Sequence, residues 1–121
     1  MVEIVLYHNP RCSKSRAALA LLEARGSEFR IVEYLREPLS RRELGELRAR
    51  LSSDPVPWIR SKESAFAEAG LSESSSEEEL LAAVEAHPIL LERPIAVRGE
   101  RAVIGRPPER ILELLEPSQA P

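Results

Sequence analysis

The first third of the chain alternates between two regular patterns of hydrophobic and polar positions. Residues 2–7 form a short apolar run rich in β-branched side chains, which indicates a buried strand. Apolar residues then recur at helical spacing from Ser13, and Gly26 stands where helices commonly end. Residues 29–34 alternate again and predict a second strand, parallel to the first because a whole helix separates them, so that the three form a right-handed βαβ unit. The residues expected on the buried face of this helix are Ala17, Ala18, Leu21 and Leu22.

Two capping boxes mark helix starts in the middle of the chain. In each of them a serine is followed three residues later by a glutamate, as Ser40 by Glu43 and Ser76 by Glu79. A shorter helical pattern lies between the two helices that they begin, and Pro88 should end the last of the three. We interpret residues of about 40–88 as a helical insertion.

The C-terminal third predicts a hairpin followed by a helix. Short apolar runs at 95–97 and 101–104 flank Gly99, and Pro107-Pro108 is a typical helix opening. Residues 117–121 should form a frayed tail. The predicted order is βαβα, helical insertion, ββα, which is an α/β fold with a mixed sheet. The residues expected on the buried side of the last helix are Ile111, Leu112, Leu114 and Leu115.

Composition narrows the functional classes. The 121 residues suit one domain over 1–121, and a net charge of −3 gives no reason to expect nucleic acid or an anionic membrane as partner. The longest purely apolar run, residues 17–22, is far shorter than the ~18 residues of a membrane span, and the first residues resemble no leader. We therefore expect a cytoplasmic protein, and we also expect it to be a monomer. One cysteine and two distant histidines exclude an internal disulfide and make a metal site unexpected.

The single cysteine, Cys12, occupies a chemically favourable position. It follows the first predicted strand by a short turn and immediately precedes the predicted helix, so its sulfur should lie at a helix N-terminus. Free backbone N–H groups and the helix dipole favour an anion there, which means a thiolate or a bound oxyanion. A buried structural cysteine is the alternative interpretation, but the polar turn HNPRCSKS is not typical of one. Ser15 stands where a CxxC motif has its second thiol, so a dithiol mechanism within this chain is excluded.

Four motifs together resemble a known family. YHNPRCSKSR, Arg60, HPILLERPI and IGRPPE occur in the order and spacing of the ArsC-type arsenate reductases, which use glutathione and glutaredoxin and have a thioredoxin-like fold with a helical insertion. The resemblance covers essentially the whole chain. The best-known members have small residues after the cysteine, where this chain has Ser13 and Lys14.

The resemblance implies a role for each matching residue. Cys12 would be the nucleophile, and Arg60, Arg93 and Arg106 would bind arsenate and the covalent intermediate. A guanidinium suits a tetrahedral oxyanion because it stays charged and offers paired N–H donors. Without the motifs, each arginine would be read as a solvated surface charge. Pro94 would be the cis-proline that faces the active-site loop.

The supporting residues keep two interpretations each. His8 could lower the pKa of the thiol by charge or hydrogen bonding, or stabilise the turn. Asn9 and Ser15 could hydrogen-bond the sulfur or cap the helix. His87, next to Pro88, is read as part of a helix stop rather than as a ligand.

The predicted function is reduction of arsenate to arsenite, with glutathione as co-substrate, glutaredoxin as partner and no bound cofactor. Cys12 would attack arsenic to form a covalent thioarsenate. Two alternatives share the fold: a glutathione-linked thiol-disulfide oxidoreductase that acts on another substrate, and a regulator that binds RNA polymerase, as the Spx-type proteins do. The Spx-type proteins use a CxxC switch, which Ser15 removes here.

Overall fold

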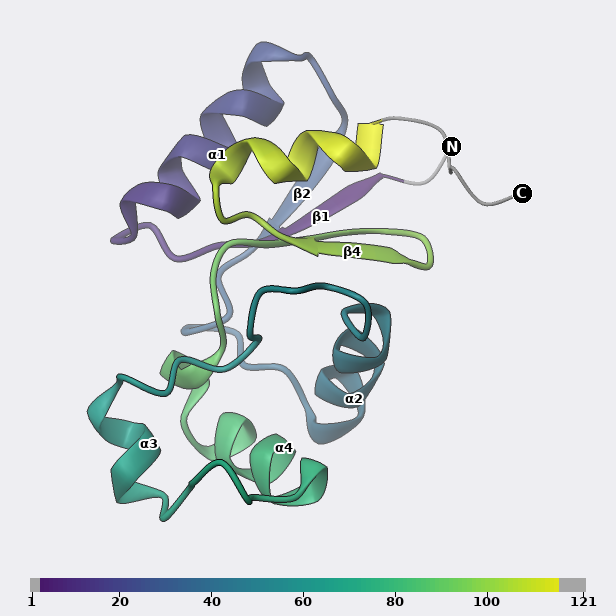
Figure 1. Ribbon diagram of the computed structural model, residues 1–121. Coiled ribbons are helices and arrows are strands. Elements are labelled where there is room, and N and C mark those ends of the chain that lie inside the picture. Colours follow the sequence, from purple (N-terminus) through teal and green to yellow (C-terminus); the bar gives the residue numbers. More distant parts are fainter. Residues whose placement is uncertain (1–2, 116–121) are drawn as a thin grey trace.

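A four-stranded mixed sheet lies at the centre of the computed structural model, which describes residues 3–115 (Figure 1). The strand order is β2-β1-β3-β4. β1 pairs with β2 in parallel, as the βαβ pattern predicts, and β3 is antiparallel to both β1 and β4. The predicted tail at 117–121 lies outside the described residues. The strands are β1 (Ile4–Tyr7), β2 (Phe29–Val32), β3 (Ile95–Arg98) and β4 (Arg101–Ile104).

Helices cover both faces of the sheet (Figure 1). α1 and η2 lie together on one face, where they enclose a core that includes Leu6, Leu22 and Ile111. The segment between β2 and β3 folds into helices on the other face, and its apolar residues pack with Ile95 and Ile104 of the sheet. The helices are α1 (Ser13–Ala24), α2 (Arg41–Arg50), α3 (Ser64–Glu68), α4 (Glu77–Ala86), η1 (Pro88–Leu90) and η2 (Pro108–Leu115).

Both predicted capping boxes are confirmed. The Ser40 hydroxyl accepts a hydrogen bond from the backbone N–H of Glu43, whose carboxylate accepts one from the N–H of Ser40. Ser76 and Glu79 form the same reciprocal pair at the start of α4. Each box satisfies N–H groups that a helix N-terminus leaves without partners, and these two helices therefore begin where the sequence predicts.

Three local predictions were wrong in detail. On α1 the buried stripe is Ser15, Ala18 and Leu22, whereas Ala17 is exposed, because burial follows an i, i+3, i+7 row of the helix. The second strand ends at Val32 instead of residue 34, since the chain turns there. The last helix is 3₁₀ rather than α; with three residues per turn, its fully buried side chains are Ile111 and Leu114, while Leu112 and Leu115 are half-buried.

The loop before β3 and the loop after β4 each contain a cis peptide bond. These are Arg93-Pro94, where the resemblance predicted it, and Arg106-Pro107, where no cis bond was predicted. Pro94 is buried. Among residues 3–115, no helix is long and apolar enough to cross a membrane.

Candidate active site

Cys12 is the N-cap residue of α1, as its position between strand and helix predicts. Its backbone is extended, with φ −93° and ψ 123°, and it is half-buried at the end of the turn that follows β1. The N–H of Cys12 donates to the carbonyl of Asn9 at 3.0 Å, and the N–H of Arg16 donates to the carbonyl of Cys12 at 3.0 Å. These two bonds hold the cysteine between turn and helix, so that its sulfur faces the first turn of α1.

The surroundings of Cys12 favour the thiolate. Burial by itself raises the pKa of the Cys12 thiol, but hydrogen bonding from the backbone of Ser15, from the Arg93 side chain, from the backbone of Lys14 and from the Ser15 hydroxyl outweighs it, and the pKa lies below its ordinary value. The Cys12 side chain does not form a capping hydrogen bond of ordinary geometry with a backbone N–H of α1. The first-turn N–H groups nevertheless act on the sulfur as they would on any anion at a helix N-terminus.

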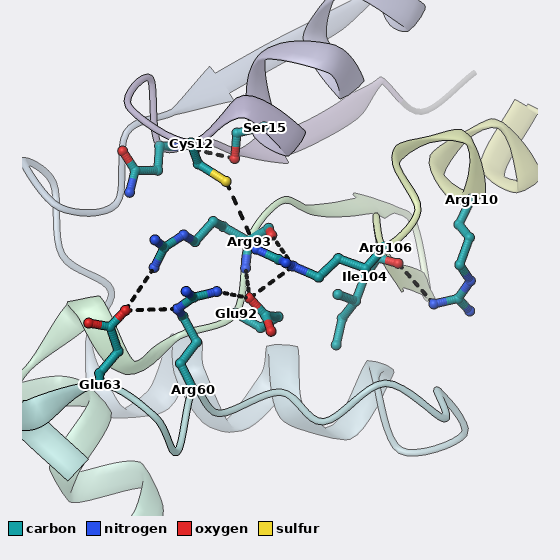
Figure 2. Close-up of polar contacts among 10 residues, drawn as sticks. Cys12, Ser15, Arg60, Glu63, Glu92, Arg93, Ile104, Arg106 and Arg110 are labelled. Carbon is teal, nitrogen blue, oxygen red and sulfur yellow. Dashed lines mark hydrogen bonds and ion pairs between the residues drawn. The ribbon is translucent and has the colours of Figure 1, made fainter.

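Two of the three predicted arginines lie beside the sulfur (Figure 2). Nη2 of Arg106 is 3.9 Å from Sγ of Cys12, and its Nε donates to the carbonyl of Arg93 at 2.9 Å. Arg93 acts on the thiol by the hydrogen bonding described above. Within the described part of the chain, Nε and Nη1 of Arg93 are buried and have no hydrogen-bond partner. Because an unpartnered buried donor is destabilising, these two groups are suited to donate hydrogen bonds to a ligand oxyanion.

Arg60 joins the site through carboxylates rather than through the sulfur (Figure 2). Its Nη1 donates to Oε1 of Glu92 at 2.6 Å, and its Nε donates to Oε2 of Glu63 at 3.1 Å. Burial tends to lower the pKa of Arg60, but the bonds to Glu92 and Glu63 raise it above its ordinary value. No hydrogen bond between Arg60 and Cys12 is present among the described residues. Arg60 therefore lies behind Arg93 and Arg106 as seen from the thiol.

The supporting residues His8 and Asn9 are buried in the turn, and Ser15 is buried in the first turn of α1. Burial lowers the pKa of His8, which leaves it neutral near pH 7, and its Nδ1 has no hydrogen-bond partner among the described residues. Oδ1 of Asn9 accepts from the N–H of Arg11 at 3.0 Å, and the Ser15 hydroxyl accepts from the N–H of Asn9 at 3.4 Å. The Asn9 side chain thus stabilises the turn by a hydrogen bond within it. Ser15 stabilises the turn as well, and it also hydrogen-bonds the Cys12 sulfur.

Sequence reasoning missed the acidic half of the site. Glu92 and Glu63 hold the arginines, yet neither was among the predicted site residues. The signal was present, because Glu92 directly precedes Arg93 and Glu63 stands three residues after Arg60. His87, predicted as a helix stop, is the C-cap of α4 and is exposed. No group of three or more histidine, cysteine, aspartate or glutamate side chains within residues 3–115 could hold a metal ion.

Comparison with known proteins places the chain in a family. The model of the ArsC family matches residues 7–114. The chain belongs to the ArsC family. It is 41% identical over 116 residues to a protein named arsenate reductase from Haemophilus influenzae, with 94% of this chain and 100% of that protein covered. It is 44% identical over 115 residues to the uncharacterized protein YfgD of Escherichia coli, with 93% and 97% covered.

A solved structure agrees with this family membership. The arsenate reductase from Vibrio cholerae superposes on the chain with a TM-score of 0.86 at 43% identity, covering 93% of this chain and 98% of that one. The mixed sheet with its flanking helices is accordingly the thioredoxin-like fold of ArsC proteins, as the resemblance of the four motifs predicted.

Proposed function

We propose that this ArsC-family protein reduces arsenate to arsenite, with the Cys12 thiolate as nucleophile. One observation carries the proposal: the sulfur lies at the start of α1, with a lowered pKa and with Nη2 of Arg106 at 3.9 Å. A nucleophile and an oxyanion-binding group thus face the same space. The name arsenate reductase on proteins 41–43% identical to this chain supports arsenate as the substrate.

In the proposed first step, the thiolate attacks arsenic and forms an S–As bond while hydroxide leaves, taking a proton to become water. Arg93 and Arg106 stabilise the negative charge that develops on the arsenic oxygens, because their donors are already fixed before the reaction. Arsenic remains As(V) at this stage. The product is a thioarsenate on Cys12.

In the second step, the thiolate of glutathione attacks the Cys12 sulfur. The S–As bond breaks, and its electron pair stays on arsenic, which leaves as arsenite. Each of the two sulfurs supplies one of the two electrons, and they end as a mixed disulfide between Cys12 and glutathione. Ser15 cannot resolve this disulfide, since it has no thiol. We therefore propose that glutaredoxin resolves it, in the reducing cytoplasm and with this protein acting as a monomer.

The test is a coupled assay with arsenate, glutathione, glutaredoxin, glutathione reductase and NADPH. We expect arsenate-dependent NADPH oxidation by the natural chain and none by Cys12→Ser. Arg106→Gln should lower kcat by about 10²–10³-fold, the usual loss when a preorganised oxyanion donor is removed. Arg42→Gln is the matched control, because the Arg42 side chain is 89% exposed and its ion pair with Glu46 is long, at 3.9 Å.

Two outcomes would overturn the proposal. One is arsenate turnover that is retained in Cys12→Ser, and the other is the absence of arsenate turnover by the natural protein when its Cys12 thiol is free. Disulfide exchange that survives loss of Arg93 and Arg106 would favour a glutathione-linked thiol-disulfide oxidoreductase instead. Capture of RNA polymerase subunits by the purified protein, without arsenate turnover, would favour the regulator.

A further inference from the structure

Glu92 is the centre of the polar network beneath Cys12 (Figure 2). Its Oε1 accepts from Nη1 of Arg60 at 2.6 Å and from the backbone N–H of Arg93 at 3.0 Å, and it lies 3.1 Å from Nε of Arg106. One carboxylate oxygen therefore contacts all three arginines of the site: Arg60 and Arg106 through their guanidiniums, and Arg93 through its backbone N–H. The Glu92 side chain is only 13% exposed, so water screens these interactions weakly.

The backbone places Glu92 opposite Trp58, diagonally across from Arg60. The N–H of Glu92 donates to the carbonyl of Trp58 at 2.8 Å, and the N–H of Arg60 donates to the carbonyl of Leu90 at 2.8 Å. Between these bonds, Ile59 and Leu91 form an antiparallel bridge. The two segments thus run side by side as a short ribbon, and the position of the carboxylate is set by the backbone.

The three guanidiniums are not equally available to a ligand. Arg60 is bonded to both Glu92 and Glu63. Arg106 directs its Nε to Glu92 and to the Arg93 carbonyl, which leaves its Nη2 toward the sulfur. Nη1 of Arg93 is 3.8 Å from Oε2 of Glu63, which is too far for a hydrogen bond. Within residues 3–115, Arg93 thus keeps two buried donors, Nε and Nη1, without hydrogen-bond partners. Arg93 and one side of Arg106 are therefore the donors left for an oxyanion.

We propose that Glu92 is a positioning and specificity-determining residue, which aims Arg106 at the sulfur and limits how tightly the site holds a tetrahedral oxyanion. A fixed negative charge in contact with the arginines repels an incoming anion and competes with it for their N–H donors. The inference rests on the proposed function in one respect, namely that the anion bound beside Cys12 is the substrate.

Anion affinity gives a direct test that does not need turnover. In Cys12→Ser protein, inorganic phosphate and arsenate would be titrated calorimetrically with and without Glu92→Gln, which removes the charge and keeps the size of the side chain. We expect both anions to bind about tenfold tighter when the charge is absent. Glu85→Gln is the matched control, since Glu85 binds Arg41 on the surface and should leave affinity unchanged.

A second variant distinguishes the effect of the charge of Glu92 from the effect of its side-chain length. Glu92→Asp keeps the charge on a shorter side chain, which cannot bridge the same groups. In the coupled assay we expect Glu92→Gln to lower both KM and kcat, and Glu92→Asp to lower kcat with no tighter anion binding. Thermal unfolding followed by circular dichroism would confirm that each variant is folded.

The outcomes of the two proposals are distinguishable. Unchanged or weaker anion binding by folded Glu92→Gln would overturn the role of Glu92, as would equal anion affinities in the Gln and Asp variants. If Glu92→Gln does not fold, the Glu92→Asp variant decides the matter. Tighter anion binding by Glu92→Asp than by the protein that keeps Glu92 would then overturn the proposed role of Glu92. Absence of arsenate turnover in the natural protein would instead overturn the proposed reductase, while the phosphate titration would still decide the role of Glu92.

Discussion

Nε of Arg106 donates to the backbone carbonyl of Arg93 at 2.9 Å, which links two arginines that lie 13 positions apart in the chain. The N–H of Gly105 reinforces this link by donating to the carbonyl of Pro94 at 2.8 Å. The loop before β3 and the loop after β4 therefore behave as one unit. A change in the conformation of either loop should therefore move both arginines away from the thiol.

Gly105 is the point at which this unit is most tightly packed. A Cβ atom added there would lie 2.8 Å from Cγ of Pro94 and 3.1 Å from Cγ2 of Ile111, both closer than van der Waals contact. We expect Gly105→Ala to lower the free energy of unfolding by about 1–3 kcal/mol, as overpacking a buried site does. Chemical denaturation would measure the loss.

Gly45 provides the matched control for that substitution. It lies inside α2 with nothing within 4 Å of an added Cβ. Gly45→Ala should raise the free energy of unfolding by about 1 kcal/mol, because alanine loses less conformational entropy in a helix. The same response at both positions would contradict the packing argument.

The ionisation of Cys12 should depend on Arg93. Burial opposes the thiolate, and hydrogen bonds from Ser15, Arg93 and Lys14 together lower the pKa of the thiol below its ordinary value. The midpoint of the alkylation rate against pH should therefore lie below that of a free cysteine. Arg93→Gln replaces the charged group that hydrogen-bonds the sulfur, so the midpoint should move to higher pH.

Arg11 serves as the control for Arg93. It neighbours Cys12 in the sequence but is exposed, and water screens its charge. Arg11→Gln should leave the alkylation midpoint nearly unchanged. A larger shift for Arg11→Gln than for Arg93→Gln would show that general surface charge, rather than the structured site, controls the thiol.

The parts of the fold that were predicted correctly have local causes. The capping boxes at Ser40 and Ser76 and the N-terminal position of Cys12 depend on residues a few positions apart, which the sequence displays directly. The side-chain partners of Arg60 could not be predicted in this way. Its partner Glu92 is 32 positions away and reaches it only through the ribbon formed by two loops, so tertiary structure decides whether this arginine faces the ligand or a carboxylate.

Asp54 illustrates a buried charge that periodicity does not reveal. Its side chain is 3% exposed; one oxygen accepts from the N–H of Ile104 at 2.9 Å, and the other from Nη1 of Arg110 at 3.0 Å. Arg110 in turn donates to the carbonyl of Ile104 at 2.9 Å. Asp54 thus connects the loop that follows α2 to the end of β4.

Removing this carboxylate should be strongly destabilising, because it takes the buried counter-charge away from Arg110 and the acceptor away from the backbone N–H groups of Ile104 and Val56. We expect Asp54→Ala to lower the free energy of unfolding by about 3 kcal/mol. Glu46→Ala breaks an exposed ion pair with Arg42 and should change it by about 0.5 kcal/mol or less. Urea denaturation of both variants would measure the difference, and similar losses would contradict a buried role for Asp54.

Tyr34 is fully buried in the core between the sheet and the helical segment, yet its hydroxyl has no hydrogen-bond partner among residues 3–115. Burial raises its pKa to about 12, so the phenol is neutral at physiological pH. An unsatisfied buried hydroxyl is destabilising by about 1–3 kcal/mol relative to a bonded one.

Since Tyr34→Phe removes only this group, we expect the free energy of unfolding in urea to be retained or to increase by about 1 kcal/mol. Leu39→Ala, which opens a cavity in the same core, should destabilise the protein by about 2–5 kcal/mol. A loss of stability in Tyr34→Phe comparable to that of the cavity variant would mean that the hydroxyl has a partner in solution and that the core is built around it.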